Sequence, residues 1–542
     1  NASGTISVTS SLGSTTSSSS YTNLGYISNA STDWNTTTTW LGSAVPPAAA
    51  TVTIVHAVTV NGTVTNNPNT VTINASSSLT FGASGALGIN TSLTNNGTLA
   101  WTTSGTLTMA ASSTLTNNAT FTRGTGTINF SGAGTINGSA AITLNNLTIN
   151  TGVLTLTTVP TIAGTFTINN GNVSTAPIYT NTSTLFYNVS YNRFNEWNAS
   201  GIGTIGSTPG YPNHVTINTG TFDIVNGVAG TARACAGTLT VNNGAIFNFN
   251  AFAATFTAGN GVTINTGAVM NANTLSGAFN VTGNVATIGS GSLNMGSMTS
   301  DLTVTGSISN GGTLTQSSSS GSDIFVTGDF NNTGGAFNNS GRAVNLIGTG
   351  TQTLSGTLNG SVPSNCFAFL IINKASGGVT LSTPVNVSNV LTLTQGIVTT
   401  TTTNILTITA TGTGGISGGS TTAYVSGPLA RAIPANLASG STYVFPVGKG
   451  GTYYPLSAVN PTSGASAPTL TVEAFNSNPG GSADASLSSV STTEYWSLAA
   501  TGNFNGTSVS LTRQIAIGSF NTIGNSTSAA GTYTNIGGTV AS

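Results

Sequence analysis

The sequence predicts an all-β protein: a parallel β-helix (β-solenoid) followed by a C-terminal antiparallel β-sandwich. Short apolar strand cores recur about every 20 residues, Asn and Gly fill the segments between them, and helix-forming stretches are nearly absent from the repeating region. A repeat of short strands and tight turns is typical of a stacked solenoid, in which each coil contacts only its neighbours. The lack of helices excludes a fold built from strand–helix–strand crossovers.

The composition supports a folded, non-enzymatic protein. Of 542 residues, 8 are Lys or Arg, 9 are Asp or Glu and 2 are His, while 37% are hydrophobic. Disordered chains usually combine low hydrophobicity with high net charge, which this chain lacks. Acid/base catalysis and hard-metal binding draw on the residue types that are scarce here. We therefore expect no catalytic residue, no metal ligand and no cofactor.

The same scarcity bears on partners and location. Nucleic acids and anionic membranes need clustered Lys and Arg, so neither is an expected partner. The longest obvious apolar run, residues 366–372, is far shorter than the roughly 18–20 residues of a membrane span, so membrane insertion is not expected. The chain opens on Asn1 rather than Met, as after removal of a leader, and we expect a secreted protein.

Residues 1–32 are rich in Ser and Thr and predict a loose N-terminal arm or an added strand. The solenoid then begins twice. Trp34 precedes the segment 52–54 (VTI), and Trp197 precedes the segment 215–217 (VTI), with prolines between them in both cases. Such a loop would cap the open end of a solenoid and cover its strand edges. We therefore predict two solenoid segments, residues 33–195 and residues 196–418.

Within these segments the repeat is visible by eye. Residues 93–99 (LTNNGTL) reappear 22 residues later as 115–121 (LTNNATF), and residues 147–152 (LTINTG) are followed after 19 residues by 166–171 (FTINNG). Apolar residues are expected to face the core and Thr and Ser to face outward. Asn and Gly are expected at the corners because they tolerate positive φ. Later strand cores centre on Val241, Ile264, Val281, Val304 and Val326.

From residue 419 to residue 542 the short repeat fades. Aromatic residues and Pro appear within longer alternating segments, such as residues 443–446 (YVFP), 470–475 (LTVEAF) and 494–498 (EYWSL). Alternating segments of this length predict antiparallel strands, and we expect a β-sandwich of about seven of them.

Three stretches carry a resemblance to a known group of proteins: residues 33–47, residues 191–217, and residues 424–497, which include FPVGKGGTYYP at 445–455. In these stretches the chain resembles large β-helical, adhesin-like surface proteins of Bacteroidetes that are exported by the type IX secretion route. The resemblance implies a cell-surface location and a structural or adhesive role. It implies no catalytic residues. Such proteins usually end in a sorting domain, and the resemblance implies either that this domain is cleaved off or that the polypeptide continues beyond Ser542.

Several sequence motifs are weak evidence for catalysis or ligand binding. Residues 415–419 (GISGG) match a nucleophile pattern, but that motif needs a following helix, an acid and a His, and His56 and His214 both lie far upstream. These histidines lack companion metal ligands. Lys449 lacks the neighbours of a phosphate-binding loop and is expected in a turn.

Other polar residues are assigned structural roles. Asp301 and Asp323, 22 residues apart, are expected to stack one coil apart; with Asp329 they form the densest acidic group, for which cation binding is the alternative to exposed turn acids. Arg193 and Glu196 flank Trp197 and are expected to form an ion pair. Cys235 and Cys366 are expected to remain unpaired thiols, because about six coils would separate them.

Aromatic and Thr residues leave two further alternatives. Trp34, Trp40 and Trp197 are expected to plug the core, with stacking on sugars as the alternative. Thr pairs such as Thr155 and Thr157 suggest ice binding, but outward Thr is ordinary on an uncharged strand.

These observations predict an extracellular structural protein of a bacterial surface, an adhesin or a subunit of a fibre or layer. Near-zero net charge favours self-association. The alternative function is carbohydrate binding by a lectin-like terminal sandwich, with surface glycans as partners. A glycan-cleaving β-helix would need two converging carboxylates, which the sparse acids do not favour.

Overall fold

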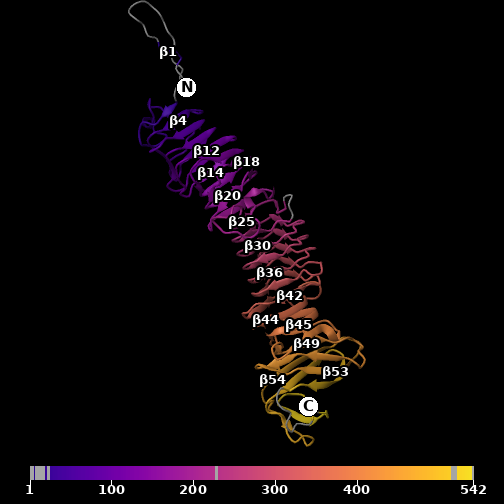
Figure 1. The fold of residues 1–542 in the computed structure, drawn as a ribbon. Coiled ribbons are helices and arrows are strands. Elements are labelled where there is room, and N and C mark those ends of the chain that lie inside the picture. Colours follow the sequence, from indigo (N-terminus) through magenta and orange to yellow (C-terminus); the bar gives the residue numbers. More distant parts are fainter. Residues whose placement is uncertain (1–4, 7–18, 21–24, 226–229, 514–521, 540–542) are drawn as a thin grey trace, which may run out of the picture. The chain divides into compact units, whose positions relative to one another are not determined.

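The computed structural model describes residues 5–6, 19–20, 25–225, 230–513 and 522–539. These residues contain no α-helix. They form β-strands and three 3₁₀ helices, η1 (Thr37–Thr39), η2 (Asn195–Trp197) and η3 (Thr413–Gly415). The strands build a parallel β-solenoid of about 19 turns and C-terminal antiparallel sheets, which confirms the predicted fold class (Figure 1).

Most of the predicted N-terminal arm lies outside the described residues. Its described parts are an antiparallel pair of two-residue strands, β1 (Thr5–Ile6) and β2 (Ser19–Ser20), and residues 25–32. In the latter, β3 (Tyr26–Ile27) is an added strand that pairs in parallel with β4 (Thr51–Ile54). From residue 25 onward, the chain divides into two compact units: residues up to 247 with 256–259, and residues 248–255 with 260–542.

The first unit stacks its strands in chain order into parallel sheets (Figure 1). One sheet contains β3 (Tyr26–Ile27), β4 (Thr51–Ile54), β6 (Thr70–Ile73), β9 (Ser92–Asn95), β12 (Ser113–Asn117), β15 (Gly134–Asn137), β18 (Val153–Leu156) and β21 (Asn172–Val173). A second contains β5 (Ala57–Val60), β7 (Ser78–Phe81), β10 (Thr98–Trp101) and β13 (Thr120–Thr122). A third runs through β8 (Ala86–Ile89), β11 (Thr106–Met109), β14 (Thr127–Phe130), β17 (Asn146–Ile149), β20 (Thr165–Ile168), β23 (Thr184–Tyr187), β25 (His214–Ile217) and β28 (Leu239–Val241).

Shorter strands complete this unit. They are β16 (Thr143–Leu144), β19 (Thr161–Ile162), β22 (Ile178–Tyr179), β24 (Tyr191–Asn192), β26 (Thr221–Asp223), β27 (Arg233–Cys235) and β30 (Phe256–Ala258). The main segment of the unit ends at residue 247, within β29 (Ile246–Asn248).

The register of these sheets reproduces the sequence repeat. Leu93 of β9 lies opposite Leu115 of β12, and Leu147 of β17 lies opposite Phe166 of β20. All four side chains are fully buried. Each coil therefore contributes one apolar residue to a continuous internal row, and the coils above and below shield it from water.

Asparagine side chains form a ladder beside the third sheet of this unit; Asn129 lies within β14, and each of the other participants directly follows a strand. The amide Nδ2 of each residue donates to Oδ1 of the one a coil earlier, at 2.6–3.1 Å. The participants are Asn129, Asn150, Asn169, Asn188, Asn218 and Asn242. None of them has a positive φ. The expectation that corner Asn residues serve through positive φ is therefore wrong here: their amides bridge successive coils instead.

The second unit repeats this architecture with shorter strands. One row holds β31 (Val262–Ile264), β34 (Val285–Thr287), β37 (Ile308–Asn310), β40 (Phe330–Asn332) and β43 (Gln352–Gly356). The next holds β32 (Val269–Asn271), β35 (Ser292–Asn294), β38 (Thr313–Thr315) and β41 (Ala336–Asn338). The third holds β33 (Phe279–Val281), β36 (Leu302–Val304), β39 (Ile324–Val326) and β42 (Ala343–Leu346).

These registers correct one detail of the predicted repeat. Val281, Val304 and Val326 stack directly on one another. Ile264 instead lies opposite Thr287, in a different row. The 17-residue step from Ile264 to Val281 therefore joins two rows rather than two coils of one row.

Two long strands continue the solenoid. The first part of β44 (Phe367–Leu381) pairs with β42 and its last part with β43, and β45 (Val385–Thr399) stacks on β44. Parallel pairing extends through β46 (Leu406–Ile408), β47 (Ile416–Gly418), β48 (Val425–Ser426) and β49 (Leu429–Ala432) to β51 (Val447–Lys449). The parallel stacking of coils thus continues about 30 residues past position 418, to Gly448 of β51.

Antiparallel pairing begins at β49. This strand pairs with β54 (Thr469–Phe475), which pairs with β56 (Tyr495–Thr501). A second antiparallel sheet joins β50 (Thr442–Phe445), β53 (Leu456–Ser463) and β57 (Phe504–Leu511). The remaining strands are β52 (Thr452–Tyr453), β55 (Ser482–Ala483), β58 (Gly524–Asn525) and β59 (Thr532–Asn535).

Candidate functional site

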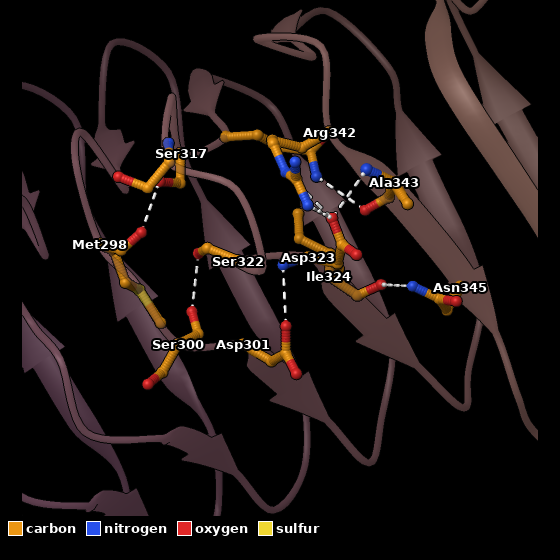
Figure 2. A network of polar contacts seen from close by, with 12 residues as sticks. Met298, Ser300, Asp301, Ser317, Ser322, Asp323, Ile324, Arg342, Ala343 and Asn345 are labelled. Atoms are coloured by element: carbon orange, nitrogen blue, oxygen red, sulfur yellow. Dashed lines mark hydrogen bonds and ion pairs between the residues drawn. The ribbon is translucent and has the colours of Figure 1, made fainter. Parts of the chain in front are cut away.

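The densest acidic group lies in the second unit, where successive coils stack Asp301 directly below Asp323 (Figure 2). Asp301 precedes β36 and Asp323 precedes β39, so their following residues, Leu302 and Ile324, are register partners. The predicted stacking of these two acids is therefore confirmed. Asp329 precedes β40, in a different row of strands.

Each of these carboxylates accepts a backbone N–H from the next coil. Asp301 Oδ1 accepts from the amide of Asp323 at 2.9 Å, and Asp329 Oδ1 accepts from the amide of Thr353 at 2.7 Å. Asp323 Oδ1 accepts from the amide of Ala343 at 3.0 Å and also from the Arg342 guanidinium, with Nη2 at 2.7 Å (Figure 2). Charge-assisted bonds of this kind are stronger than neutral ones.

This arrangement favours a scaffold role over a cation site. The Arg342 guanidinium already neutralises the charge of Asp323, and each of the three carboxylates binds an amide of the next coil rather than a shared centre. Across the described residues, no group of three or more His, Cys, Asp or Glu side chains could hold a metal ion. Neighbouring hydroxyls join the same network: Ser322 Oγ donates to the carbonyl of Ser300 at 2.7 Å.

The second ionisable cluster surrounds Glu196 in the first unit, and here the sequence prediction is wrong. Arg193 and Glu196 are not an ion pair. Arg193 donates instead to the carbonyl oxygens of Ile224, Phe194 and Trp197, at 2.9–3.0 Å. Three backbone carbonyls already match the donor geometry of the guanidinium, so it is satisfied without the carboxylate.

Glu196 is fully buried and has its own partners. Its Oε1 accepts from the Tyr187 hydroxyl and from the Phe194 amide, both at 2.9 Å, and Oε2 accepts from the Tyr191 hydroxyl at 3.3 Å. Burial raises the pKa of Glu196 above its usual range, and these hydrogen bonds oppose the rise. Burial, followed by the nearby carboxyl, also raises the pKa of Tyr187 well above normal. The cluster is enclosed and closes the cap loop onto the solenoid.

The tryptophans of the predicted caps lie inside the protein. Trp34 and Trp197 are 0% exposed and Trp40 is 1% exposed, so the prediction of core plugging is confirmed and these rings are not available to stack on sugars. Trp40 Nε1 donates to the carbonyl of Trp34, and Trp197 Nε1 donates to that of Ala234, both at 2.8 Å.

The remaining motifs have ordinary structural surroundings. Ser417 lies on the short strand β47 opposite Thr392, so it is not on a strand-to-helix elbow. His56 contacts Ser28 and His214 contacts Thr238. Cys235 and Cys366 are both buried and free, which confirms the prediction of two unpaired thiols.

A surface cluster on the C-terminal sheets escaped the sequence analysis. The rings of Phe475 and Tyr495 stack in parallel with centroids 4.4 Å apart. Lys449 Nζ lies 5.8 Å from the Phe475 centroid and 3.2 Å from Oε1 of Glu473. The alternation along β54 could have shown that Glu473 and Phe475 share a face, but the contribution of Lys449 comes from another sheet strand. Because these side chains are partly exposed, the cluster offers an aromatic surface beside two charges.

No helix among the described residues is long and apolar enough to cross a membrane. Comparisons of the chain with family models, with curated proteins and with solved structures found no match.

Proposed function

We propose that this chain is an extracellular structural protein of a bacterial surface, an adhesin or the subunit of a fibre or layer, and that it catalyses no reaction. The observation that carries the proposal is that the few charged side chains of the two clusters bind backbone groups of the solenoid. Asp301, Asp323 and Asp329 each bind an amide of the following coil, and Arg193 binds three carbonyl oxygens. Ionisable groups committed in this way stabilise a scaffold.

The scaffold itself suits a load-bearing role. Asparagine amides connect six successive coils beside the third sheet of the first unit, and the apolar rows inside are continuous from coil to coil. A structure of this kind resists local opening because each coil is hydrogen-bonded on both sides. Near-zero net charge also removes the repulsion that keeps copies of a protein apart.

Negative-stain electron microscopy of the purified full chain tests the proposal. Concentration-dependent filaments, sheets or end-to-end assemblies support it, and so does saturable binding to cells. Monodisperse particles that bind no cell surface contradict it. Deletion of residues 1–30 tests whether the arm joins copies by strand addition: unchanged polymer length means that it does not.

Carbohydrate binding is the second candidate function, and the surface cluster of Lys449, Glu473, Phe475 and Tyr495 favours it. Aromatic rings beside hydrogen-bonding charges are the usual elements of a sugar site. A glycan array probed with the full chain tests this candidate. Binding that is lost in Glu473→Gln and Tyr495→Ala supports it, whereas an array without signal leaves the purely structural role.

A further inference from the structure

One face of the first unit carries two parallel rows of side-chain hydroxyls. The strands β4, β6, β9, β12, β15 and β18 pair in register, so their outward residues align from coil to coil. The first row contains Thr51, Thr70, Ser92, Thr114, Thr135 and Thr155, and the second contains Thr53, Thr72, Thr94, Thr116 and Asn137. We call these two rows the threonine face.

The threonine face has the geometry of a regular two-dimensional lattice. Neighbouring strands lie about 4.8 Å apart, and residues two apart along a strand are separated by about 6.6 Å. Thr side chains in strands have restricted χ1, so the hydroxyls hold their positions. Beneath the face, the buried row of Val52, Val71, Leu93 and Leu115 keeps the strands level, and the buried amides of Asn95 and Asn117 bond across coils at 2.7 Å.

The hydroxyls of this face are free to bind an external lattice. Within the described part of the chain, none of the ten Ser and Thr hydroxyls has a hydrogen-bond partner in the protein. Thr51 and Thr155 are exposed, and the other eight residues are partly exposed. Neither row contains a charged or aromatic residue. The matching outward positions of other sheets are less regular: Ala57 and Ala100 interrupt the rows of β5, β7, β10 and β13, and Thr303 of β36 lies between Asn280 and Phe325.

We propose that the threonine face binds ice. A hydroxyl both donates and accepts, as each water molecule in ice does, and the Thr methyl fills the space between. The face presents hydroxyls in a two-dimensional array, spaced about 4.8 Å by about 6.6 Å, so an ordered layer of water can form many weak contacts with it at once. Because the side chains are already ordered, binding loses little conformational entropy. A sugar surface is a poorer fit, since neither row offers an aromatic ring for stacking.

The test is adsorption of the full chain to a growing ice hemisphere, together with the inhibition of ice recrystallisation. We expect enrichment of the protein in the ice fraction. Thr94→Lys places a bulky charge in the middle of the face, and we expect it to reduce the enrichment at least tenfold. Thr303→Lys makes the same change at an irregular outward position, and we expect it to have no effect.

Circular dichroism melts show whether Thr94→Lys still folds, and Thr72→Lys provides a second substitution in the same row. The proposal is overturned if the native chain is excluded from ice like an ordinary soluble protein. It is also overturned if both variants adsorb as well as the native chain. Adsorption to microcrystalline cellulose without adsorption to ice, lost in Thr94→Lys, would assign the face to a polysaccharide instead.

Discussion

Asn95 donates its side-chain amide to Oδ1 of Asn117 at 2.7 Å, and both side chains are fully buried. The two residues lie 22 positions apart, one coil above the other. Asn117 in turn donates to the carbonyl of Ala141 at 3.0 Å. A chain of amides thus links three successive segments inside a largely apolar interior, where an unpaired polar group is costly.

Replacing Asn117 by Ala should destabilise the first unit by about 1–3 kcal/mol, because the Ala141 carbonyl loses its side-chain donor and Asn95 loses an acceptor. Hydrogen exchange measured by mass spectrometry should show faster exchange in residues 92–95 and 134–137. The neighbouring Asn118 also bonds across coils, to Asn96 and Ser139, but these bonds are exposed to water. Asn118→Ala therefore serves as the matched control, with a smaller expected cost of about 0.5–1 kcal/mol. Equal costs of the two variants would show that the buried amide of Asn117 stabilises the unit no more than an exposed amide does.

Glu196 predicts a pH dependence of stability. Burial raises its pKa in the folded state above the ordinary value of 4.5, so at pH values between the two pKa values the folded state holds a proton that the unfolded chain has released. The contribution of this group is therefore fully present below pH 4.5 and is lost as pH rises through the folded pKa. Because a Gln side chain does not titrate, Glu196→Gln should not lose this stability as pH rises.

The measurement is the melting temperature of the native chain and of Glu196→Gln between pH 4 and pH 8. The variant should gain stability relative to the native chain as pH rises. Glu473→Gln, which removes a carboxylate from the C-terminal sheet, is the control for a nonspecific effect. A constant difference between Glu196→Gln and the native chain across this range contradicts the prediction.

Trp197 stabilises the second cap through both its volume and its indole N–H. Its ring packs against Phe222 and Phe256, with centroids 5.9 and 6.0 Å away. Trp197→Ala should cost about 3–5 kcal/mol because of the cavity that it leaves. Trp197→Phe keeps most of the packing but leaves the Ala234 carbonyl without the indole donor, at about 1–3 kcal/mol. Urea unfolding followed by circular dichroism measures the free energy of unfolding of both variants, and Trp197→Ala should be the less stable of the two.

Asp323 connects two coils through the Ala343 amide and holds Arg342. Asp323→Ala should destabilise the second unit by about 1–3 kcal/mol, mainly through the unpaired amide. Arg342→Ala should cost less, because the guanidinium is partly exposed. The double variant isolates the ion-pair coupling, which we expect to be about 0.2–1 kcal/mol. A coupling that exceeds the cost of Asp323→Ala alone would show that the amide bond contributes little.

Only some contacts of the acidic group around Asp323 could be predicted from the sequence. The stacking of Asp301 on Asp323 followed from their 22-residue separation, which equals one coil. The partner of Asp323 could not be predicted in the same way, since Arg342 lies 19 residues further on and reaches it only because of the way its coil turns. The surface cluster that contains Phe475 and Tyr495 depends on the antiparallel pairing of β54 with β56. This pairing joins distant segments, so the alternation within each strand does not predict it.

The sequence by itself determined the solenoid, its approximate coil length and the inward direction of its regularly spaced apolar residues. It could do so because stacking in register makes one coil's pattern repeat in the next. The tertiary structure decided which polar groups meet. Arg193 and Glu196 are close along the chain, yet each found better-placed partners elsewhere: backbone carbonyls for the guanidinium, tyrosine hydroxyls and an amide for the carboxylate. Hydrogen bonds are directional and short, so their partners depend on three-dimensional positions that spacing does not specify.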